Sequence, residues 1–503
     1  MVLRRIHYVR DGIKHMLKKC IAVVVFILAI SVIVNSTHNP YTNTAFIEQP
    51  STDQGDVPIK QASQNALSDK NIINIYTCDA EMERVFAKYA ALHPGFDYKT
   101  HYTQDAAGAY YRELLSALQT DNGKEIDIYC VPGWYAEEFI KGEYAGYASA
   151  YKQLGIDVDS ALKKADIPQY AIDAGTNSVG EIVTLPYEAS VGVFMYRRSI
   201  AKKVWGTDEP DTIAEIIGTG SDNWAKFVEA AQTLKKQGYD IVPGCYGIWP
   251  LFADGIDAYD RNRIGNNMLP QKWEQFFEVS KLLYDNGCIK DIDSYTDEWV
   301  QALDGKEDKP VFGFVTTENQ FKQLGYEQDL KNTAGDWALC QTTGVNTSDG
   351  THSGIMVNKN SLLKDKIAPL IEWITLNSSK TGLQHRLAND TLYRTENVND
   401  ELYKMYGKKR TVASAAIMKN TSNCIDFLGG QNINTIIYNT IRMSNREKHQ
   451  RYTSLDSAFN NEWYSIVRAC LKEDKSKEMA IAEFKAKMSD IEKRHKEYMN
   501  VIY

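Results

Sequence analysis

Acidic and aromatic side chains follow two apolar, β-branched runs of this sequence at the points where the runs end. Asp79 follows the run 71–78 (NIINIYTC), and Trp134 and Tyr135 follow the run 126–131 (IDIYCV) after a Pro-Gly pair. An aromatic ring buries apolar area without demanding a hydrogen bond, and a carboxylate accepts strong hydrogen bonds. These residue types favour non-covalent binding of a ligand. The competing interpretations are that Asp79 caps a following helix and that Trp134 packs on one.

Further candidate binding residues lie in loops or directly after predicted strands. Tyr187 and Glu188 follow a Leu-Pro pair, and Trp249 and Asp254 lie in the stretch GIWPLFADG, whose Pro and Gly favour a loop. The alternative interpretation of Asp254 is that it is a turn residue. The remaining candidates are an acid after the strand VFGFV, a tryptophan in GDWAL and a histidine before a predicted strand: Glu318, Trp337 and His352. A position in a hydrophobic core fits Trp337 as well as a ligand contact does.

The sequence holds no recognisable catalytic or metal-binding motif. GxSxG, HExxH and GxxxxGK[ST] are missing, and the nine histidines show no paired ligand spacing. The acidic stretch 291–297 is interpreted as a solvated loop, because Tyr295 and Thr296 replace the Asp/Asn and Gly that an EF-hand needs. We therefore predict no catalytic residue, no metal and no cofactor. A pair of glycosidase carboxylates has no motif, so a glycan-active enzyme stays an alternative.

The elements around the first candidates predict a parallel sheet. Apolar side chains recur with helical spacing between 82 and 89, after the first strand. A strand at 96–102, a helix at 110–118 and the strand at 126–131 complete a strand–helix–strand–helix–strand order. Right-handed crossovers make such a sheet parallel, and ligands bind at the carboxyl ends of its strands.

The rest of the chain also contains the strand and helix patterns of an α/β protein. A turn is expected at 177–180. Further strands are predicted at Glu181–Leu185, Val191–Tyr196, Val311–Val315, Asp336–Cys340 and Gly354–Val357. Further helices are predicted from Trp224 onward and at Trp273–Tyr284, Ile367–Ile374, Trp463–Leu471 and Glu478–Ile491. The folded part is longer than one core usually spans, so more than one domain is expected.

The start of the chain predicts export. Basic residues precede an apolar run of 14 residues, Ile21–Val34, which is shorter than the roughly 20 residues of a membrane-spanning helix and typical of a secretory signal. Residues 1–36 are predicted to be a signal peptide or signal anchor, with translation starting at Met1 or Met16. The polar residues 37–70 are predicted to be a flexible linker. The protein would then be extracytoplasmic, and membrane-attached if this segment is kept.

Charge and cysteine content add two further expectations. The 503 residues carry a net charge of −8, which argues against a nucleic-acid-binding protein. The eight cysteines show no CxxC spacing, so a zinc ribbon or a thioredoxin-type site has no support. Cys78 and Cys130 end two predicted strands, and a disulfide between them is one option that the sequence leaves open.

Several stretches carry a resemblance to a known family. They are INIYTCDAEMERVFAKYAALHPG, IDIYCVPGWYAEEF, VGEIVTLPYEASVGVFMYRRSI, DNWAKFVEAAQTLKKQG, GDWALCQTTG leading to SGIMVNKNS, and the closing WYSIVRACLKEDKSKEMAIAEFKAKM. In this order and spacing they resemble the extracellular solute-binding proteins of ABC importers, the carbohydrate-type group related to maltose-binding protein. The resemblance implies a two-lobed α/β fold of the periplasmic-binding-protein type II, with a ligand cleft between lobes joined by hinge crossings. It places lobe 1 at residues 71–190 plus 354–410 and lobe 2 at 191–353 plus 411–500.

The same resemblance implies a function. The protein would capture a carbohydrate, in particular an oligosaccharide, by hinge closure and deliver it to the transmembrane permease subunits of an ABC transporter. A sugar has apolar C–H faces and a rim of hydroxyls, which suit the candidate rings and carboxylates. Tyr187 and Glu188 would lie near the first crossing, where this family often contacts its ligand. A secreted glycan-active enzyme and a ligand sensor for a membrane receptor are the alternatives.

Overall fold

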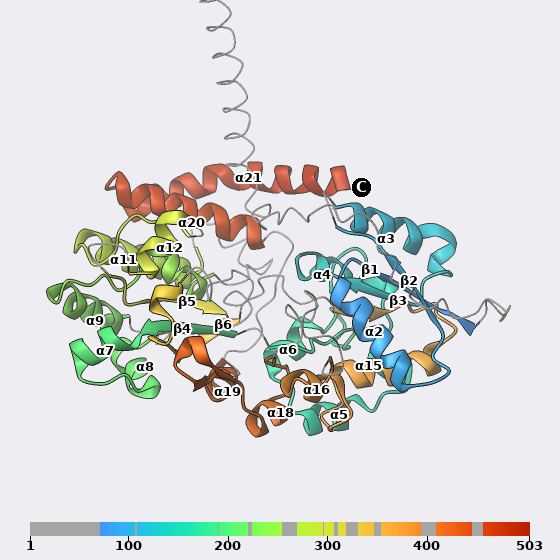
Figure 1. The fold of residues 1–503 in the computed structure, drawn as a ribbon. Coiled ribbons are helices and arrows are strands. Elements are labelled where there is room, and N and C mark those ends of the chain that lie inside the picture. The colour runs from blue at the N-terminus through green and yellow to red at the C-terminus, as the bar shows by residue number, and fades with distance from the viewer. Residues whose placement is uncertain are drawn as a thin grey trace, which may run out of the picture. The chain divides into compact units, whose positions relative to one another are not determined.

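The chain forms two separate main sheets, each accompanied by helices (Figure 1). The computed structural model describes residues 71–105, 108–189, 191–219, 224–253, 269–294, 296–305, 310–317, 330–346, 354–393, 409–444 and 456–502. Asp69–Tyr503 makes up one compact unit. Within the described residues the strands form a four-stranded, a three-stranded and a small two-stranded sheet.

The first sheet has three parallel strands and one antiparallel edge strand. Its order is β2 (Tyr98–Tyr102), β1 (Ile73–Thr77), β3 (Ile128–Val131) and β7 (Gly354–Val357). β1 pairs in parallel with β2 and with β3, which confirms the predicted parallel sheet, and β7 pairs antiparallel with β3. The helices that precede β4, together with the first three that follow β7, are α2 (Ala80–Leu92), α3 (Ala109–Gln119), α4 (Gly133–Ile140), α5 (Val158–Ala165), α6 (Gln169–Ala174), α15 (Lys364–Thr375), α16 (Leu383–Ala388) and α18 (Ala415–Asn420).

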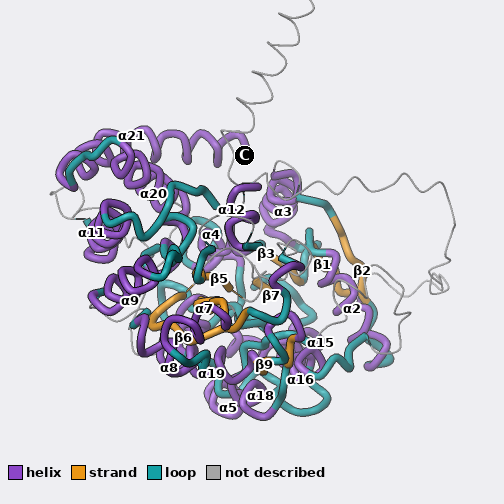
Figure 2. The backbone as a smooth tube through the Cα atoms, turned by 60° about the vertical axis from the view of Figure 1, so that its left-hand side comes forward, coloured by secondary structure: helices purple, strands orange, loops and turns teal. Residues whose placement is uncertain are grey.

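The second sheet is antiparallel throughout. Its order is β5 (Gly313–Thr317), β4 (Val191–Arg197) and β6 (Trp337–Asn346). The remaining helices are α7 (Arg198–Trp205), α8 (Pro210–Ile217), α9 (Ala225–Lys236), α11 (Gln271–Asp285), α12 (Asp297–Leu303), α19 (Ile433–Ser444), α20 (Asp456–Lys472) and α21 (Lys477–Ile502), and the ribbon strands are β8 (Cys424–Ile425) and β9 (Gln431–Asn432). α20 and α21 lie side by side and both contact α11 (Figure 2).

Periodicity and capping explain the first strand–helix unit. The four apolar residues that recur with helical spacing between 82 and 89 are all buried along one face of α2. Asp79 caps this helix, and its Oδ1 accepts a hydrogen bond from the backbone N–H of Glu81 at 2.8 Å. The local sequence therefore fixes where β1 ends and α2 begins.

The predicted strand at Glu181–Leu185 is wrong. Only an isolated bridge between Thr176 and Ile182 forms there, although the turn at 177–180 is present. Val183 and Leu185 are fully buried, while the backbone N–H of Val183 donates to Gly175 O at 2.9 Å. The apolar run therefore reflects burial against the core and not pairing with a neighbouring strand.

The chain enters the second sheet through a segment that pairs with a later one. Residues 187–189 lead into β4, and residues 411–413 run antiparallel beside them. Glu188 and Val412 form a bridge, and the N–H of Ala413 donates to Tyr187 O at 3.1 Å. We refer to these two short segments as the paired crossings.

The last passage between the sheets involves α18. α18 packs against α5 and α16, which belong with the first sheet, and also against α19. α19, the next helix, packs against β4 and β6 of the second sheet. The passage that begins with residues 411–413 is therefore completed at α19.

A hydrophobic core continues through the paired crossings. One cluster of buried side chains includes Ile75 and Ile355 of the first sheet, Val193 and Leu339 of the second, and Leu185 just before the first crossing. Two further clusters contain mainly residues of one sheet and its helices. The crossings are thus packed into the core and are not exposed linkers.

Several expectations concern thiols or membranes. All seven cysteines from Cys78 to Cys470 are free thiols, so the disulfide between Cys78 and Cys130 does not form. Within the described ranges, no helix combines the length and the apolar character needed to cross a membrane. The predicted signal segment 1–36 and the linker 37–70 lie outside the described residues, as do Asp254, Glu318 and His352.

Candidate functional site

The carboxyl ends of β1 and β3 are neighbours in the first sheet. The Tyr110 hydroxyl, from α3, lies 2.9 Å from Tyr76 O and 2.6 Å from Cys130 O, and so joins the ends of the two strands. Asp79 follows β1, and Trp134 lies in the first turn of α4, three residues after the end of β3 at Val131. The parallel pairing brings these two helix starts to the same edge of the sheet, where ligands of such sheets bind.

Asp79 acts as a helix cap, as one of the two interpretations of the sequence proposed. Besides accepting from Glu81, it donates its own backbone N–H to Thr77 Oγ1 at 3.0 Å. Burial raises the pKa of its carboxyl above the usual value, and the Glu81 and Met82 backbone N–H groups oppose that shift. A carboxylate has about four positions that accept hydrogen bonds, so the capping hydrogen bond does not use all of them.

A buried charged cluster lies next to Asp79. Arg410 forms ion pairs with two carboxylates, through Nη1 with Glu81 and through Nε with Glu188. Glu81 is 4% exposed and Glu188 6% exposed. Glu188, Asp79 and Arg410 all act on the pKa of Glu81, and Arg410 and Glu188 act on that of Asp79. We call Asp79, Glu81, Tyr187, Glu188 and Arg410 the Arg410 cluster.

Carboxylates outnumber cations in the Arg410 cluster. Burial raises the pKa of Glu81 to about 7, and the ion pair with Arg410 opposes the shift. Burial also raises the pKa of Tyr187 far above its usual value, and Glu81 and Glu188 add to that effect. An excess of buried acceptor oxygens can hold the hydroxyl or amine donors of a ligand.

The titration of Glu81 gives a first prediction. In the folded chain Glu81 binds a proton near pH 7, whereas its ordinary pKa is 4.5. Between these values the folded state binds more protons than the unfolded state, so the Glu81 contribution to the free energy of unfolding falls as the pH rises from about 5 to about 7.5, by at most about 3 kcal/mol. Glu81→Gln removes this contribution. Urea unfolding at several pH values measures it, and equal pH slopes in the two proteins would contradict the prediction.

Three of the aromatic candidates lie inside hydrophobic clusters. Trp337 is fully buried, and its Nε1 donates to Thr333 Oγ1 at 2.8 Å. Trp249 is 4% exposed, with its ring centroid 4.5 Å from that of Phe276. Tyr135 is 5% exposed and belongs to a cluster of aromatic side chains from α3 and α4. The structure thus places these rings in the core, where they support the fold.

Residues 291–294 of the acidic stretch are irregular, and the partly exposed carboxylates of Asp291 and Asp293 form ion pairs. Arg468 of α20 bonds to this stretch, with Nε 2.7 Å from Asp291 Oδ1 and a second ion pair to Asp293. The Tyr464 hydroxyl donates to Asp293 Oδ1 at 2.8 Å. These carboxylates therefore fasten α20 to the second sheet's helices. No group of acidic, cysteine or histidine residues suited to a metal ion occurs in the part of the chain that the structure describes.

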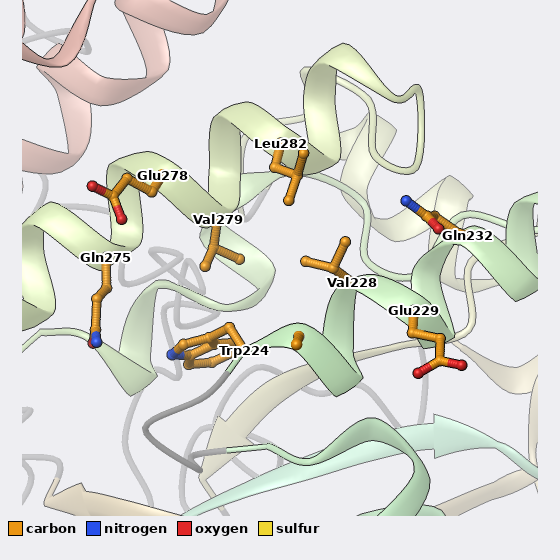
Figure 3. Close-up of a pocket in the computed structure, with 9 residues that line it drawn as sticks. Trp224, Val228, Glu229, Gln232, Gln275, Glu278, Val279 and Leu282 are labelled. Atoms are coloured by element: carbon orange, nitrogen blue, oxygen red, sulfur yellow. The ribbon is translucent and has the colours of Figure 1, made fainter.

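A groove of about 530 Å³ lies between α9 and α11, and the sequence reasoning did not single it out. Val228 and Val279 point toward one another across it, and Trp224 lies at one end (Figure 3). The other lining residues are Ala225, Glu229, Gln232, Gln275, Glu278 and Leu282. One face of the Trp224 ring is already covered, because it stacks on Phe252 at 4.4 Å. None of these residues belongs to the Arg410 cluster.

Comparisons with known proteins place the fold. Residues 77–380 match the model of a family described as bacterial extracellular solute-binding protein, and no curated protein matches the sequence. A crystal structure titled extracellular solute-binding protein family 1 is similar with a TM-score of 0.59 at 14% identity, covering 83% of this chain and 98% of that one. The sugar-binding protein MalE from Xanthomonas citri gives 0.56 at 12% identity, with 85% and 99% covered. The galacto-N-biose/lacto-N-biose I-binding protein of an ABC transporter from Bifidobacterium longum gives 0.52 at 13% identity, with 84% and 97% covered. These likenesses show a shared two-lobed type II fold and confirm the predicted fold class.

Proposed function

The chain belongs to the bacterial extracellular solute-binding protein family, whose model matches residues 77–380, and on that premise we propose that it captures a carbohydrate for uptake through an ABC permease. Two proteins of the same fold support the choice of ligand, since one is a sugar-binding MalE and the other was solved with lacto-N-biose. The abundance of tryptophan and tyrosine, 9 and 30 residues, favours an oligosaccharide. The sugar leaves the protein chemically unchanged.

We assign the sugar contacts to the edge of the first sheet and the adjoining crossing. Asp79 is only partly buried and lies at the end of β1, and Trp134 occupies the matching position after β3. Tyr187 and Glu188 are 7% and 6% exposed, so they would meet the sugar only as the hinge moves. Asp254 and Glu318 stay proposed contacts, although they lie outside the described residues.

One observation carries this assignment most directly. Folding brings Glu188 to the guanidinium of Arg410, which also pairs with Glu81, two residues after Asp79 and more than 100 residues before Glu188 in the sequence. They come together where the chain passes from one sheet to the other. A site at this position is able to sense the relative movement of two lobes, which is what capture by hinge closure requires.

For delivery, the protein must stay close to its permease. The proposed N-terminal segment, if uncleaved, would hold the folded unit at the outer face of the membrane through the linker 37–70. Such a tether raises the effective concentration of the receptor near the permease. The permease subunits are therefore the expected protein partner, together with the membrane itself.

Asp79 offers the sharpest test of this function. A panel of maltose, maltotriose, cellobiose, xylobiose, lactose and lacto-N-biose is added to the full chain, and the melting temperature is recorded. At least one sugar is expected to raise it, because a ligand that binds only the folded state stabilises that state. Asp79→Asn is then expected to weaken binding of that sugar about tenfold or more, since a charge-assisted hydrogen bond is lost.

The same substitution should leave the unliganded protein nearly as stable as before. Asparagine caps helices about as well as aspartate, so α2 keeps its cap. Asp157→Asn is the matched control, because Asp157 caps α5 in the same way and is not part of the Arg410 cluster. No response to any sugar of the panel would refute the carbohydrate assignment. Recovery of a hydrolysed sugar would favour a glycan-active enzyme instead.

A further inference from the structure

Arg410 connects three segments of the chain that are distant in sequence. Its Nη1 pairs with Glu81 in the first turn of α2, which is 329 residues away, and its Nε pairs with Glu188 in the first crossing. Its own backbone N–H donates to Leu387 O, in α16, at 3.2 Å. A single residue thereby ties α2, α16 and the paired crossings together.

The backbone around Arg410 shows what these contacts hold in place. The residues that follow it form the second of the paired crossings, in which the N–H of Ala189 donates to Thr411 O at 3.4 Å. Glu188, one of the two partners of Arg410, forms the bridge with Val412. The side-chain ion pair and the backbone pairing therefore act on the same few residues.

The burial of this ion pair indicates a role beyond general stability. Charged groups lose hydration when buried, and replacing a buried ion pair by apolar residues often costs little stability, so such pairs are weak stabilisers. Such a pair contributes more to fixing the geometry than to stability. Breaking it leaves a buried charge without compensation, so conformations in which the pair is broken are disfavoured. The two carboxylates here come from the first turn of α2, which the proposed sugar contact Asp79 caps, and from the first crossing.

We propose that Arg410 is a positioning residue for solute capture. By holding Glu81 and Glu188 with different nitrogens, its guanidinium fixes the paired crossings relative to the first turn of α2 and so sets where Asp79 and Glu188 stand with respect to each other. The inference rests on the proposed function in that Asp79 and Glu188 are its sugar contacts. The positioning itself is a property of the unliganded chain.

The chemistry of arginine predicts how substitutions behave. The planar guanidinium presents separate N–H donors to two carboxylates at once, whereas lysine offers one compact charge. Arg410→Lys keeps the charge but is expected to hold the two acids less firmly. Arg410→Met keeps much of the side-chain length and removes both ion pairs. Arg468→Met is the matched control, because Arg468 also bridges two carboxylates, Asp291 and Asp293, but away from the Arg410 cluster.

Hydrogen–deuterium exchange of the full chain without sugar tests the positioning. In Arg410→Met, the backbone amides of Ala189 and Ala413 are expected to exchange at least about tenfold faster, while those of β3 stay as protected as before. Arg410→Lys should fall between the two proteins. Arg468→Met should leave both amides unchanged. Unchanged exchange at Ala189 and Ala413 in Arg410→Met would overturn the proposal.

Titration with the panel sugar that gives the largest thermal shift tests the consequence for capture. Arg410→Met is expected to raise the Kd about tenfold, Arg410→Lys less, and Arg468→Met to lower only the melting temperature. An Arg410→Met protein that melts earlier but binds with an unchanged Kd would show a purely structural role and overturn the proposal. If Arg410→Met does not fold, Arg410→Lys decides by the same two measurements. If no sugar binds the wild-type chain, the carbohydrate assignment fails, and the exchange measurement alone decides whether Arg410 positions the crossings.

Discussion

Replacing Trp337 by alanine is expected to lower the free energy of unfolding by about 3 to 5 kcal/mol, the usual cost of removing a large ring from a core. The side chain is fully buried at the start of β6 and packs edge-on against Phe314, with ring centroids 6.0 Å apart. The Arg197 guanidinium covers its ring at 5.3 Å. Alanine would leave a cavity and would also remove the hydrogen bond from the indole to Thr333. Urea unfolding measures the loss.

Trp337→Phe is the control for this prediction. It keeps most of the ring volume and loses the indole N–H, so it should cost clearly less than alanine. An alanine variant of nearly normal stability that no longer bound sugar would contradict the core position of Trp337. It would place this residue at the ligand surface, which is one of the two interpretations of its sequence context.

Replacing Trp134 by alanine is expected to have the opposite profile. The unliganded melting temperature should hardly change, whereas most of the rise caused by the panel sugar should disappear. At a sugar concentration of 100 times the Kd, binding contributes about 2.7 kcal/mol to the folded state, so the loss is large. The reason is the position of Trp134 at the start of α4, just after β3, whose carboxyl end neighbours that of β1; an aromatic ring there would stack on the apolar face of a sugar. Thermal melting with and without the sugar measures both effects.

Trp205→Ala provides the matched comparison for Trp134. Trp205 ends α7 and packs edge-on against Phe312, with ring centroids 5.2 Å apart. Its loss should lower the melting temperature and leave the sugar-induced rise intact. A large drop in the unliganded melting temperature of Trp134→Ala would instead make Trp134 a core residue and remove it from the site.

Periodicity predicted the fold where the elements are regular. The unit from β1 to β3 could be predicted because α2 and α3 each have a single buried face and β3 is a continuous buried run. Prediction failed where residues are buried without belonging to a regular strand or a long helix. The run at 181–185 is apolar because it lies against the core, and Trp249 is buried in a short helix although Pro250 and nearby glycines favour a loop. A proline in the first turn of a short helix is compatible with burial.

The site was only partly readable from the sequence. Asp79 could be singled out because capping and strand ends are local features. Glu81 and Arg410 carry no local signal, since a glutamate in a first helical turn and an arginine after two lysines are ordinary surface residues. They become partners only through tertiary packing across 329 residues. The ion pairs of the site therefore could not be predicted from any short stretch of the sequence.

The edge strand of the first sheet affects the order in which the chain can fold during its synthesis. β7 completes that sheet beside β3, and the hydroxyl of Ser361, just beyond it, donates to Asp127, 234 residues earlier. A growing chain has to wait for this late piece, and long-range strand pairing is slow even when the whole chain is available. The first sheet can therefore be completed only after most of the chain has been synthesised.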